Sequence, residues 1–381
     1  MDLILEALKT TGLLIWYTLW AFILGYMISA GIQVLVTREQ MARVLGERGI
    51  KQAVLSGFFG FVSSSCSFAA LAASRTVLAK GAHAANAIAF LIATTNLVLE
   101  TGIVLWVLVG WKFVVANFLL GIIMIVYAYI LTAFSLPQML ADKGRAHAER
   151  VQAEELKHPS PEGMTWWQKL TSAEGWRVIS FKFFGEWKMA YKEVLVGFTI
   201  AGLVTAFVPD AFWNALFVEE TGSPSFLTVL QHALIAPVLA FFTFVGSLGN
   251  IPLAAILWSK NASFGGVMSF LGADLVAATV IYLNAKYYGW AFTAYLSGLL
   301  YVSMVAAGVT VHWIFAAFNA IPTVRPESLA DMMSFGVDTH TFWLNVVFIP
   351  VAAILLYVRW RALRQQRRSQ PAPAKADVHS R

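Results

Sequence analysis

Charged residues are scarce in this chain. Lys, Arg, Asp and Glu make up 13% of its 381 residues, whereas a soluble domain carries about a quarter. Hydrophobic residues make up 59%, which is more than a surface with so few charged residues could cover in a soluble protein. The imbalance excludes a large soluble core and indicates a polytopic membrane protein. The 14 tryptophans agree with this, because indole rings favour the membrane interface.

Cysteine is nearly absent as well. The single residue Cys66 excludes an intramolecular disulfide and any metal site built from paired cysteines. The chain also has no P-loop, no His-Glu-x-x-His sequence and no Gly-x-Ser-Gly nucleophile sequence. We therefore expect no enzymatic activity, no cofactor and no metal ion, and ATP drive would need a separate partner.

The net charge of +6 is concentrated outside the apolar runs. Residues 135–188 are rich in Lys and Arg, and five arginines lie between positions 359 and 368. Because basic residues gather on the cytoplasmic side of a membrane, we expect the central loop and the C-terminus to be cytoplasmic. This pattern indicates a multi-pass protein of the cell inner membrane. Its expected partners are the lipid bilayer and a small-molecule substrate, and not nucleic acid. Assembly into a homo-oligomer is possible.

The apolar runs divide the chain into segments long enough to cross a bilayer, which takes about 20 residues. The expected segments are a first transmembrane half at 1–134 with a hairpin at about 53–78, a cytoplasmic loop with interfacial Trp-rich helices at 135–188, a second transmembrane half at 189–318 with a hairpin at about 226–258, an external loop at 319–340, a last span at 341–359, and a basic disordered cytoplasmic tail at 360–381.

An internal repeat relates the two halves. Phe58-Phe59-x-Phe61-Val62 recurs as Phe241-Phe242-x-Phe244-Val245, and Gly110-Trp111-x-Phe113 recurs as Gly289-Trp290-x-Phe292. Residues 89–93 and 269–273 give a third match at nearly the same offset. Chance is the competing explanation, since Phe and Ala abound in membrane proteins. With the charge count, the repeat predicts an all-α fold of two inverted-topology halves, each with a broken-helix or re-entrant hairpin, plus a C-terminal span.

Each hairpin is interrupted by small polar residues. Irregular backbone at membrane depth is tolerated only inside protein or beside a water-filled cavity, so the interruptions are candidate substrate sites. Close helix packing by small residues is the alternative. The candidate substrate-binding residues are Ser64, Ser65, Cys66 and Ser67 in the first hairpin and Ser247, Gly249, Asn250 and Pro252 in the second.

Ionisable residues within apolar runs are costly and suggest function. Asp274 and Glu100 are the candidate proton-coupling residues, although either could instead lie at the end of a span. Arg75 is expected to extend to the cytoplasmic surface, or else to attract an anionic substrate. His232 and His312 are better explained as packing residues than as ligands.

These stretches resemble the ArsP-type predicted permease family, whose characterised members export trivalent organoarsenicals. The resemblance rests on Glu186-Trp187-Lys188-Met189, on the run from Val245 to Ala254, and on Ala273-Asp274-Leu275. It covers about residues 12–318 and implies a permease. The family often has Cys-Ser-Cys in the first hairpin, whereas here only Cys66 remains, so a two-thiol arsenic site in this hairpin is impossible.

Together these features predict a proton-coupled secondary transporter that exports a small solute such as a trivalent organoarsenical or a related metalloid or anion. Two alternatives come from other classes of protein. An intramembrane enzyme would need a second carboxylate motif to match Asp274. A membrane scaffold subunit would use the central loop to bind the rest of a larger transport complex.

Overall fold

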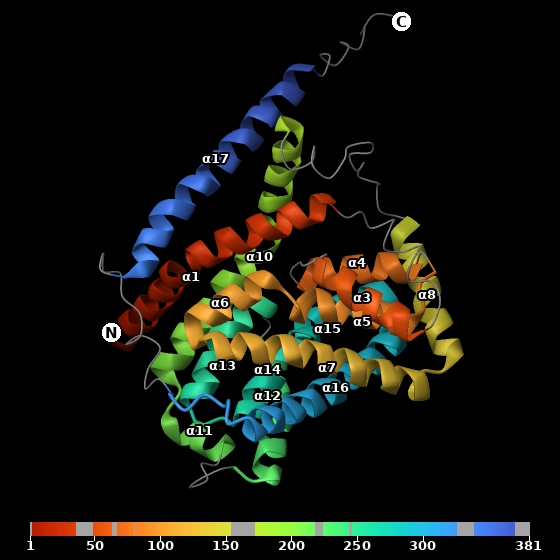
Figure 1. The fold of residues 1–381 in the computed structure, drawn as a ribbon, viewed down its shortest axis with the longest axis vertical. Helices are drawn as coiled ribbons and strands as arrows, with labels where there is room; N and C mark the ends of the chain where they lie inside the picture. The colour runs from red at the N-terminus through yellow and green to blue at the C-terminus, as the bar shows by residue number, and fades with distance from the viewer. Residues whose placement is uncertain are drawn as a thin grey trace, which may run out of the picture.

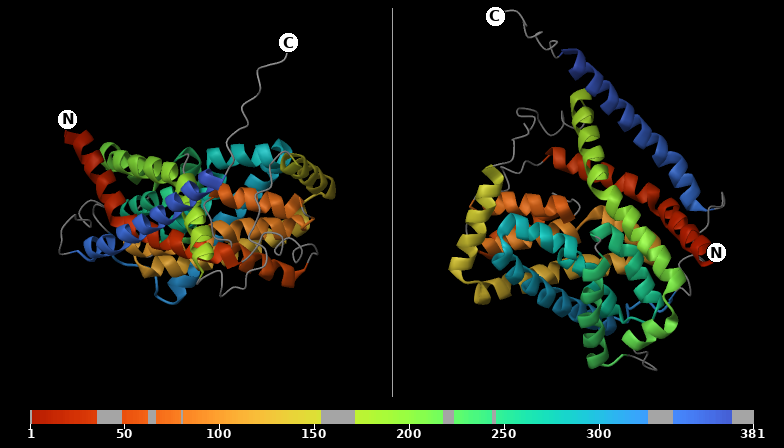
Figure 2. Two further views of the ribbon diagram at one scale, coloured as in Figure 1. Left: turned by 90° about the horizontal axis from the view of Figure 1, so that it is seen from above. Right: turned by 180° about the vertical axis from the view of Figure 1, so that it is seen from behind.

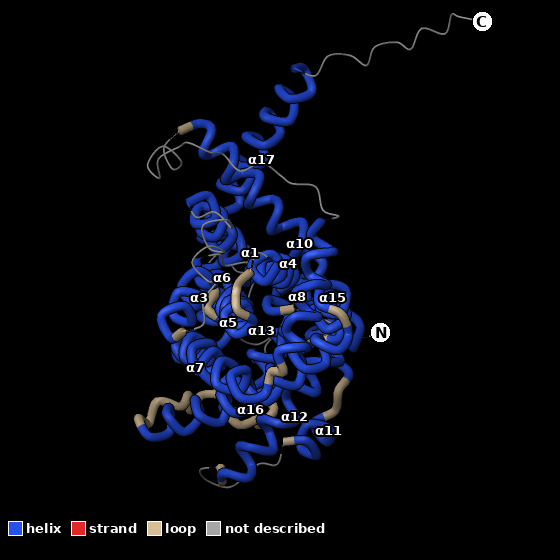
Figure 3. The backbone as a smooth tube through the Cα atoms, turned by 90° about the vertical axis from the view of Figure 1, so that its right-hand side faces the viewer, coloured by secondary structure: helices blue, strands red, loops and turns tan. Residues whose placement is uncertain are grey.

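The computed structural model describes residues 2–35, 49–62, 67–79, 81–153, 172–217, 224–243, 246–325 and 339–369 (Figure 1). These segments are helices joined by short connections, and none of them contains a strand (Figure 3). The all-α fold expected from the composition is confirmed.

The first half contains a long N-terminal helix, two short helices, a bent pair and a long closing helix. Their bounds are α1 Asp2–Leu35, α3 Ile50–Val62, α4 Ser67–Ala79, α5 Ala84–Asn96, α6 Leu99–Val109 and α7 Trp111–Ser135.

The second half follows a connecting helix and repeats this order, with one additional short helix. The bounds are α8 Gln138–Ala153, α10 Ala173–Phe207, α11 Asp210–Leu216, α12 Phe226–Thr243, α13 Ser247–Ser259, α14 Phe264–Leu271, the 3₁₀ segment η1 Gly272–Val276, α15 Ala278–Tyr288 and α16 Trp290–Ala317. The last helix, α17, spans His340–Ser369.

Five described helices are long and apolar enough to cross a membrane, and the number rises to eight if each bent pair is one span. α1, α7, α12, α16 and α17 contain the five full-length spans. The polytopic membrane architecture is therefore confirmed.

Two glycines end corresponding bent pairs. Gly110 lies between α6 and α7 with φ 99° and ψ 165°, and Gly289 lies between α15 and α16 with φ 80° and ψ 154°. Side chains other than hydrogen disfavour such positive φ values. The chain therefore turns sharply at both positions, each directly before a tryptophan.

The bends within the pairs also correspond. α5 and α6 meet at 41°, and the α14–η1 segment meets α15 at 40°. In the first half α3 and α4 pack on α5, which packs on α7; in the second half α12 and α13 pack on α14, which packs on α16. This correspondence supports a duplicated architecture, whereas the inverted orientation of the halves stays a prediction.

Two helix boundaries differ from the expected segments. α10 runs without interruption from Ala173 to Phe207, through the expected junction at 188–189. No proline interrupts it, and Ile179, Phe183 and Glu186 form a buried stripe at helical spacing. α17 continues to Ser369, past the expected start of the tail at 360, because Arg, Ala, Leu and Gln favour a helix.

α1, α10 and α17 pack together along one side of the molecule (Figure 2). The Asn345 side chain on α17 donates a hydrogen bond to the Trp16 carbonyl on α1 at 2.8 Å. Much of α17 remains uncovered, with large apolar side chains such as Trp343 and Ile354 exposed. Such a surface suits contact with lipid.

α8 packs across one end of the helix bundle, against α4, α15 and α16. Arg145 donates to the Ala82 carbonyl at 3.0 Å, and the His147 ring forms a hydrogen bond with the Lys286 carbonyl at 3.1 Å. Ala148 on α8 is fully buried. The helix ends that α8 joins are those expected on the cytoplasmic side.

An aromatic cluster joins the ends expected on the opposite side. The Phe113 ring lies 5.4 Å from Trp258 and 5.3 Å from Phe264. The Arg325 guanidinium covers the Trp258 ring at 4.1 Å and donates to the Trp258 carbonyl at 3.1 Å. The bundle thus has two distinct ends, one closed by α8 and one by this cluster.

Candidate functional site

The start of α13 forms the best-defined polar site inside the bundle. Gly246 has an extended backbone, with φ −90° and ψ −164°, and α13 begins at the next residue. The Ser247 hydroxyl donates a hydrogen bond to the Asp274 carboxylate at 2.5 Å. Asp274 lies in η1 and is 1% exposed. A broken helix and an irregular turn thus bring two of the predicted site residues together.

Asn250 connects the two arms of the second hairpin. Its amide oxygen accepts a hydrogen bond from the Thr243 hydroxyl at the end of α12, at 3.3 Å. Its side chain is fully buried, and its amide nitrogen has no hydrogen-bond partner among the described residues. An unsatisfied buried donor is destabilising, and this one lies one turn after Ser247, where a substrate could accept its hydrogen.

Gly249 and Pro252 are buried in the same helix. Proline has no backbone N–H, so Pro252 cannot donate to the carbonyl four residues earlier, that of Leu248. The first turns of α13 therefore combine a hydroxyl, an amide and weakened backbone bonding. These groups can coordinate a polar solute.

Asp274 lies well inside the bent segment formed by α14, η1 and α15. Asp274 follows the start of α14 by about ten residues, which corresponds to about 15 Å along a helix axis. The hydrocarbon core of a bilayer is about 30 Å thick. The predicted position of Asp274 within the membrane, and not at the end of a span, agrees with this length.

Glu100 occupies the corresponding break in the first half. It lies in the first turn of α6, directly after the bend, and is 2% exposed. Its Cβ packs so closely on α1 that a Cβ added at Gly25 would lie 2.3 Å from it. α13 packs against both α6 and η1, so the helix that carries Ser247 and Asn250 lies between the two acid-bearing segments.

The first hairpin contributes less that can be described. Ser64, Ser65 and Cys66 lie outside the described residues. Ser67 is the first residue of α4, and the structure describes its backbone but not its side chain. Their predicted role in substrate binding stays a prediction.

The structure identifies a buried cation that we had expected at the surface. Arg75 on α4 is 1% exposed, and its guanidinium lies 4.4 Å from the centre of the Tyr287 ring on α15. The expectation that Arg75 extends to the cytoplasmic surface is therefore wrong. The position of Arg75 in the middle of an apolar helix was the available signal, but its burial depends on α15, which is far away in the sequence.

The two histidines in apolar runs have structural roles, as expected. The His232 ring accepts the Ser263 backbone N–H at 3.0 Å, and the His312 ring accepts the Gly265 N–H at 3.2 Å. Both therefore satisfy backbone donors at the start of α14. Within the described segments, no group of three or more His, Cys, Asp or Glu side chains is placed to hold a metal ion.

A carboxyl group in such a site can exist in two states. When ionised it accepts hydrogen bonds, as it does from Ser247, and when protonated it can also donate one. Burial makes the charged state costly unless a proton or a polar group compensates it. The arrangement can therefore bind a polar solute and exchange a proton at the same place.

Comparisons with known proteins agree with this architecture. The chain is 37% identical over 328 residues to the Mycobacterium tuberculosis protein Rv2963, covering 84% of this chain and 79% of that protein. The name of that protein gives a permease role as a prediction and no substrate. No solved structure matches the chain. A family profile described as a predicted permease matches residues 3–313, and the chain therefore belongs to the ArsP-type predicted permease family, which makes it a multi-pass membrane permease.

Proposed function

We propose that this permease is a proton-coupled secondary transporter of the cell inner membrane that exports a small solute, such as a trivalent organoarsenical or a related metalloid or anion. The observation that carries the proposal is the buried hydrogen bond between Ser247 and Asp274, one turn from the unsatisfied amide of Asn250. It combines a protonatable group with polar groups that would bind a solute, inside the bent segment formed by α14, η1 and α15.

Coupling follows from the cost of a buried charge. While Asp274 is ionised, it needs hydrogen-bond donors such as Ser247. Protonation removes that requirement and frees the Ser247 hydroxyl to bind the solute together with the Asn250 amide. Alternation between these two states would link proton movement to solute movement.

The two ends of the bundle support an alternating-access mechanism. α8 joins the expected cytoplasmic ends, and the cluster of Phe113, Trp258 and Phe264 joins the expected external ends. Between them, α4 packs on α15 and α13 packs on α6, which are corresponding contacts in the two halves. Opening one contact while the other stays closed would expose the central site to one side at a time.

Flux measurements in everted membrane vesicles test the proposal. The vesicles are supplied with methylarsenite, arsenite and a panel of organic anions, with and without an imposed proton gradient. We expect accumulation of at least one solute that depends on the gradient. Asp274→Asn should remove the gradient dependence and lower the driven flux about tenfold or more, since mutations of coupling groups remove a functional step and not only a contact.

Glu186→Gln is the matched control, because Glu186 is also a buried carboxylic acid but belongs to α10, which is outside the second hairpin and η1. It should leave gradient-driven flux close to that of the unaltered protein. Gradient-driven flux that survives in Asp274→Asn would contradict the proposed coupling residue. Absence of flux for every solute in the unaltered protein would contradict the transport proposal.

A further inference from the structure

The contact between α4 and α15 contains a buried polar cluster that the central site does not use. Arg75 and Ser74 come from α4 and Tyr288 comes from α15, while Asn284 lies one turn before Tyr288 on the same face of α15. All four are at most 4% exposed. We refer to these four residues as the seam cluster.

Arg75 gives the seam cluster a permanent positive charge. A guanidinium stays protonated in proteins, and this one is almost completely removed from solvent. Its central carbon lies over the Tyr287 ring, 4.4 Å from the ring centre. The N–H groups of a guanidinium lie in its plane and suit carboxylate or phosphonate oxygens. A buried charge of this kind attracts anions and repels cations.

Asn284 supplies the independent observation. It is 1% exposed, and neither its amide nitrogen nor its amide oxygen has a hydrogen-bond partner in the part of the chain that the structure describes. It precedes Tyr287 and Tyr288 by three and four positions, so the three side chains share one face of α15. A buried amide with no partner is destabilising, which is readily explained if a ligand supplies the missing hydrogen bonds in part of a functional cycle.

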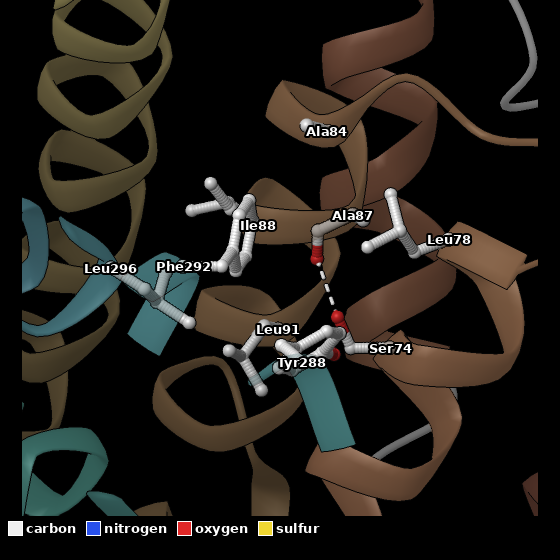
Figure 4. Close-up of a pocket in the computed structure, with 9 residues that line it drawn as sticks. All are labelled: Ser74, Leu78, Ala84, Ala87, Ile88, Leu91, Tyr288, Phe292 and Leu296. Atoms are coloured by element: carbon white, nitrogen blue, oxygen red, sulfur yellow. Dashed lines mark hydrogen bonds between the residues drawn. The ribbon is translucent and has the colours of Figure 1, made fainter. Parts of the chain in front are cut away.

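Ser74 and Tyr288 complete the cluster (Figure 4). The Ser74 hydroxyl donates to the Ala87 carbonyl at 2.9 Å, and the Tyr288 hydroxyl interacts with Ser74. They line a cavity of about 10 Å³, which is about the room needed by one water molecule. A larger ligand therefore requires α4 and α15 to separate.

We infer that the seam cluster binds a small oxyanion, such as a carboxylate or a phosphonate, when α4 and α15 part. Arg75 would supply the charge, and the Asn284 amide and the Tyr288 hydroxyl would donate directed hydrogen bonds. The inference rests on the proposed transport function, because it names an anionic class of solute and places a second binding position on the α8 side of the central site.

Thermal unfolding of the full chain in detergent tests this inference with two phosphorus compounds. Methylphosphonate is an oxyanion, and dimethyl methylphosphonate is its neutral diester. At matched ionic strength, millimolar methylphosphonate should raise the unfolding temperature by about 2–4 °C, as binding to the folded state alone requires. The neutral diester should not. Equal effects of the two compounds, or no effect of methylphosphonate, would overturn the inference.

Asn284→Leu locates the effect. The substitution removes two unsatisfied polar atoms while keeping a similar volume, so it should raise the unfolding temperature without ligand. It should also abolish the methylphosphonate shift, and Arg75→Gln should do the same. Asn345→Leu is the matched control: it removes the hydrogen bond to Trp16, so it should lower the unfolding temperature but keep the shift. A full shift in Asn284→Leu would refute the assignment to the seam cluster.

The same assay separates this inference from the proposed function. Asp274→Asn lies outside the seam cluster and should keep the methylphosphonate shift while it loses gradient-driven flux. Loss of flux with no shift in any variant would sustain proton coupling and refute the seam cluster. A methylphosphonate shift that depends on Asn284, together with gradient-driven flux in Asp274→Asn, would sustain the seam cluster and refute Asp274 as the coupling residue.

Discussion

Gly110 and Gly289 show how one residue type shapes both halves. Both have positive φ at the same place in their half, where the bent pair ends and the long closing helix begins. The sequence repeat Gly-Trp-x-Phe already marked these two positions. Their conformation could not be predicted, because it depends on how α6 and α15 meet the next helix.

Gly110→Ala should destabilise the protein by about 1–3 kcal/mol, the cost of holding a side-chain-bearing residue in this backbone region. A Cβ at Gly110 would meet no atom within 4 Å, so the effect would come from the backbone alone. Gly298→Ala is the matched control, since it also adds a Cβ in open space but within α16. It should be neutral or stabilise by up to about 1 kcal/mol. Chemical denaturation in mixed micelles measures both, and equal effects would contradict the backbone explanation.

At the same scale, polar residues in apolar runs were a useful but incomplete guide to the site. Asp274 and Asn250 stand out locally because each interrupts an apolar stretch. Arg75 stood out too, but an end-of-span position at the surface explained it equally well, and Asn284 was not identified. Only the packing of the helices shows that both are buried.

Among the elements, the short helices of the first hairpin are held by close backbone contact. A Cβ added at Gly60 on α3 would lie 2.4 Å from the Ala93 Cβ and 2.8 Å from the Phe90 carbonyl oxygen on α5. Helices approach this closely only where one of them lacks a side chain. The break positions were predictable from sequence, but this contact was not, since glycine alone does not identify its partner.

Gly60→Ala should therefore force α3 away from α5, cost about 1–3 kcal/mol as overpacking does, and reduce flux. Gly57→Ala, three positions earlier on the same helix, would place its Cβ in ordinary contact with Ile125 at 3.8 Å. It should leave stability and flux nearly unchanged. Similar losses in both variants would show that α3 tolerates no added volume anywhere, and would count against a specific contact at Gly60.

For the whole molecule, composition is enough to predict the membrane class, and the sequence repeat is enough to predict corresponding halves. The matching bends of 41° and 40° support that correspondence. The orientation of the protein in the membrane is a separate question, because the arrangement of the helices does not show which end of the bundle faces the cytoplasm. It rests on where Lys and Arg gather.

Cysteine labelling tests that sidedness. In a Cys66→Ser background, Lys143→Cys on α8 and Asp210→Cys at the start of α11 introduce thiols at two exposed positions near opposite ends of the bundle. In intact cells, a membrane-impermeant maleimide should label position 210 and not position 143, and everted vesicles should give the opposite result. Labelling of both positions from one side would contradict the expected placement of α8 and α11 on opposite sides of the membrane.

The contacts of α8 with Ala82 and Lys286 also bear on the rate of transport. Each such hydrogen bond contributes about 1 kcal/mol net, so breaking both would cost about 2 kcal/mol. An equilibrium of that size leaves roughly one molecule in thirty open toward the cytoplasm at any moment. The resting population would then be closed on that side, and loading of solute from the cytoplasm would depend on a rare conformation and not on the affinity of the central site alone.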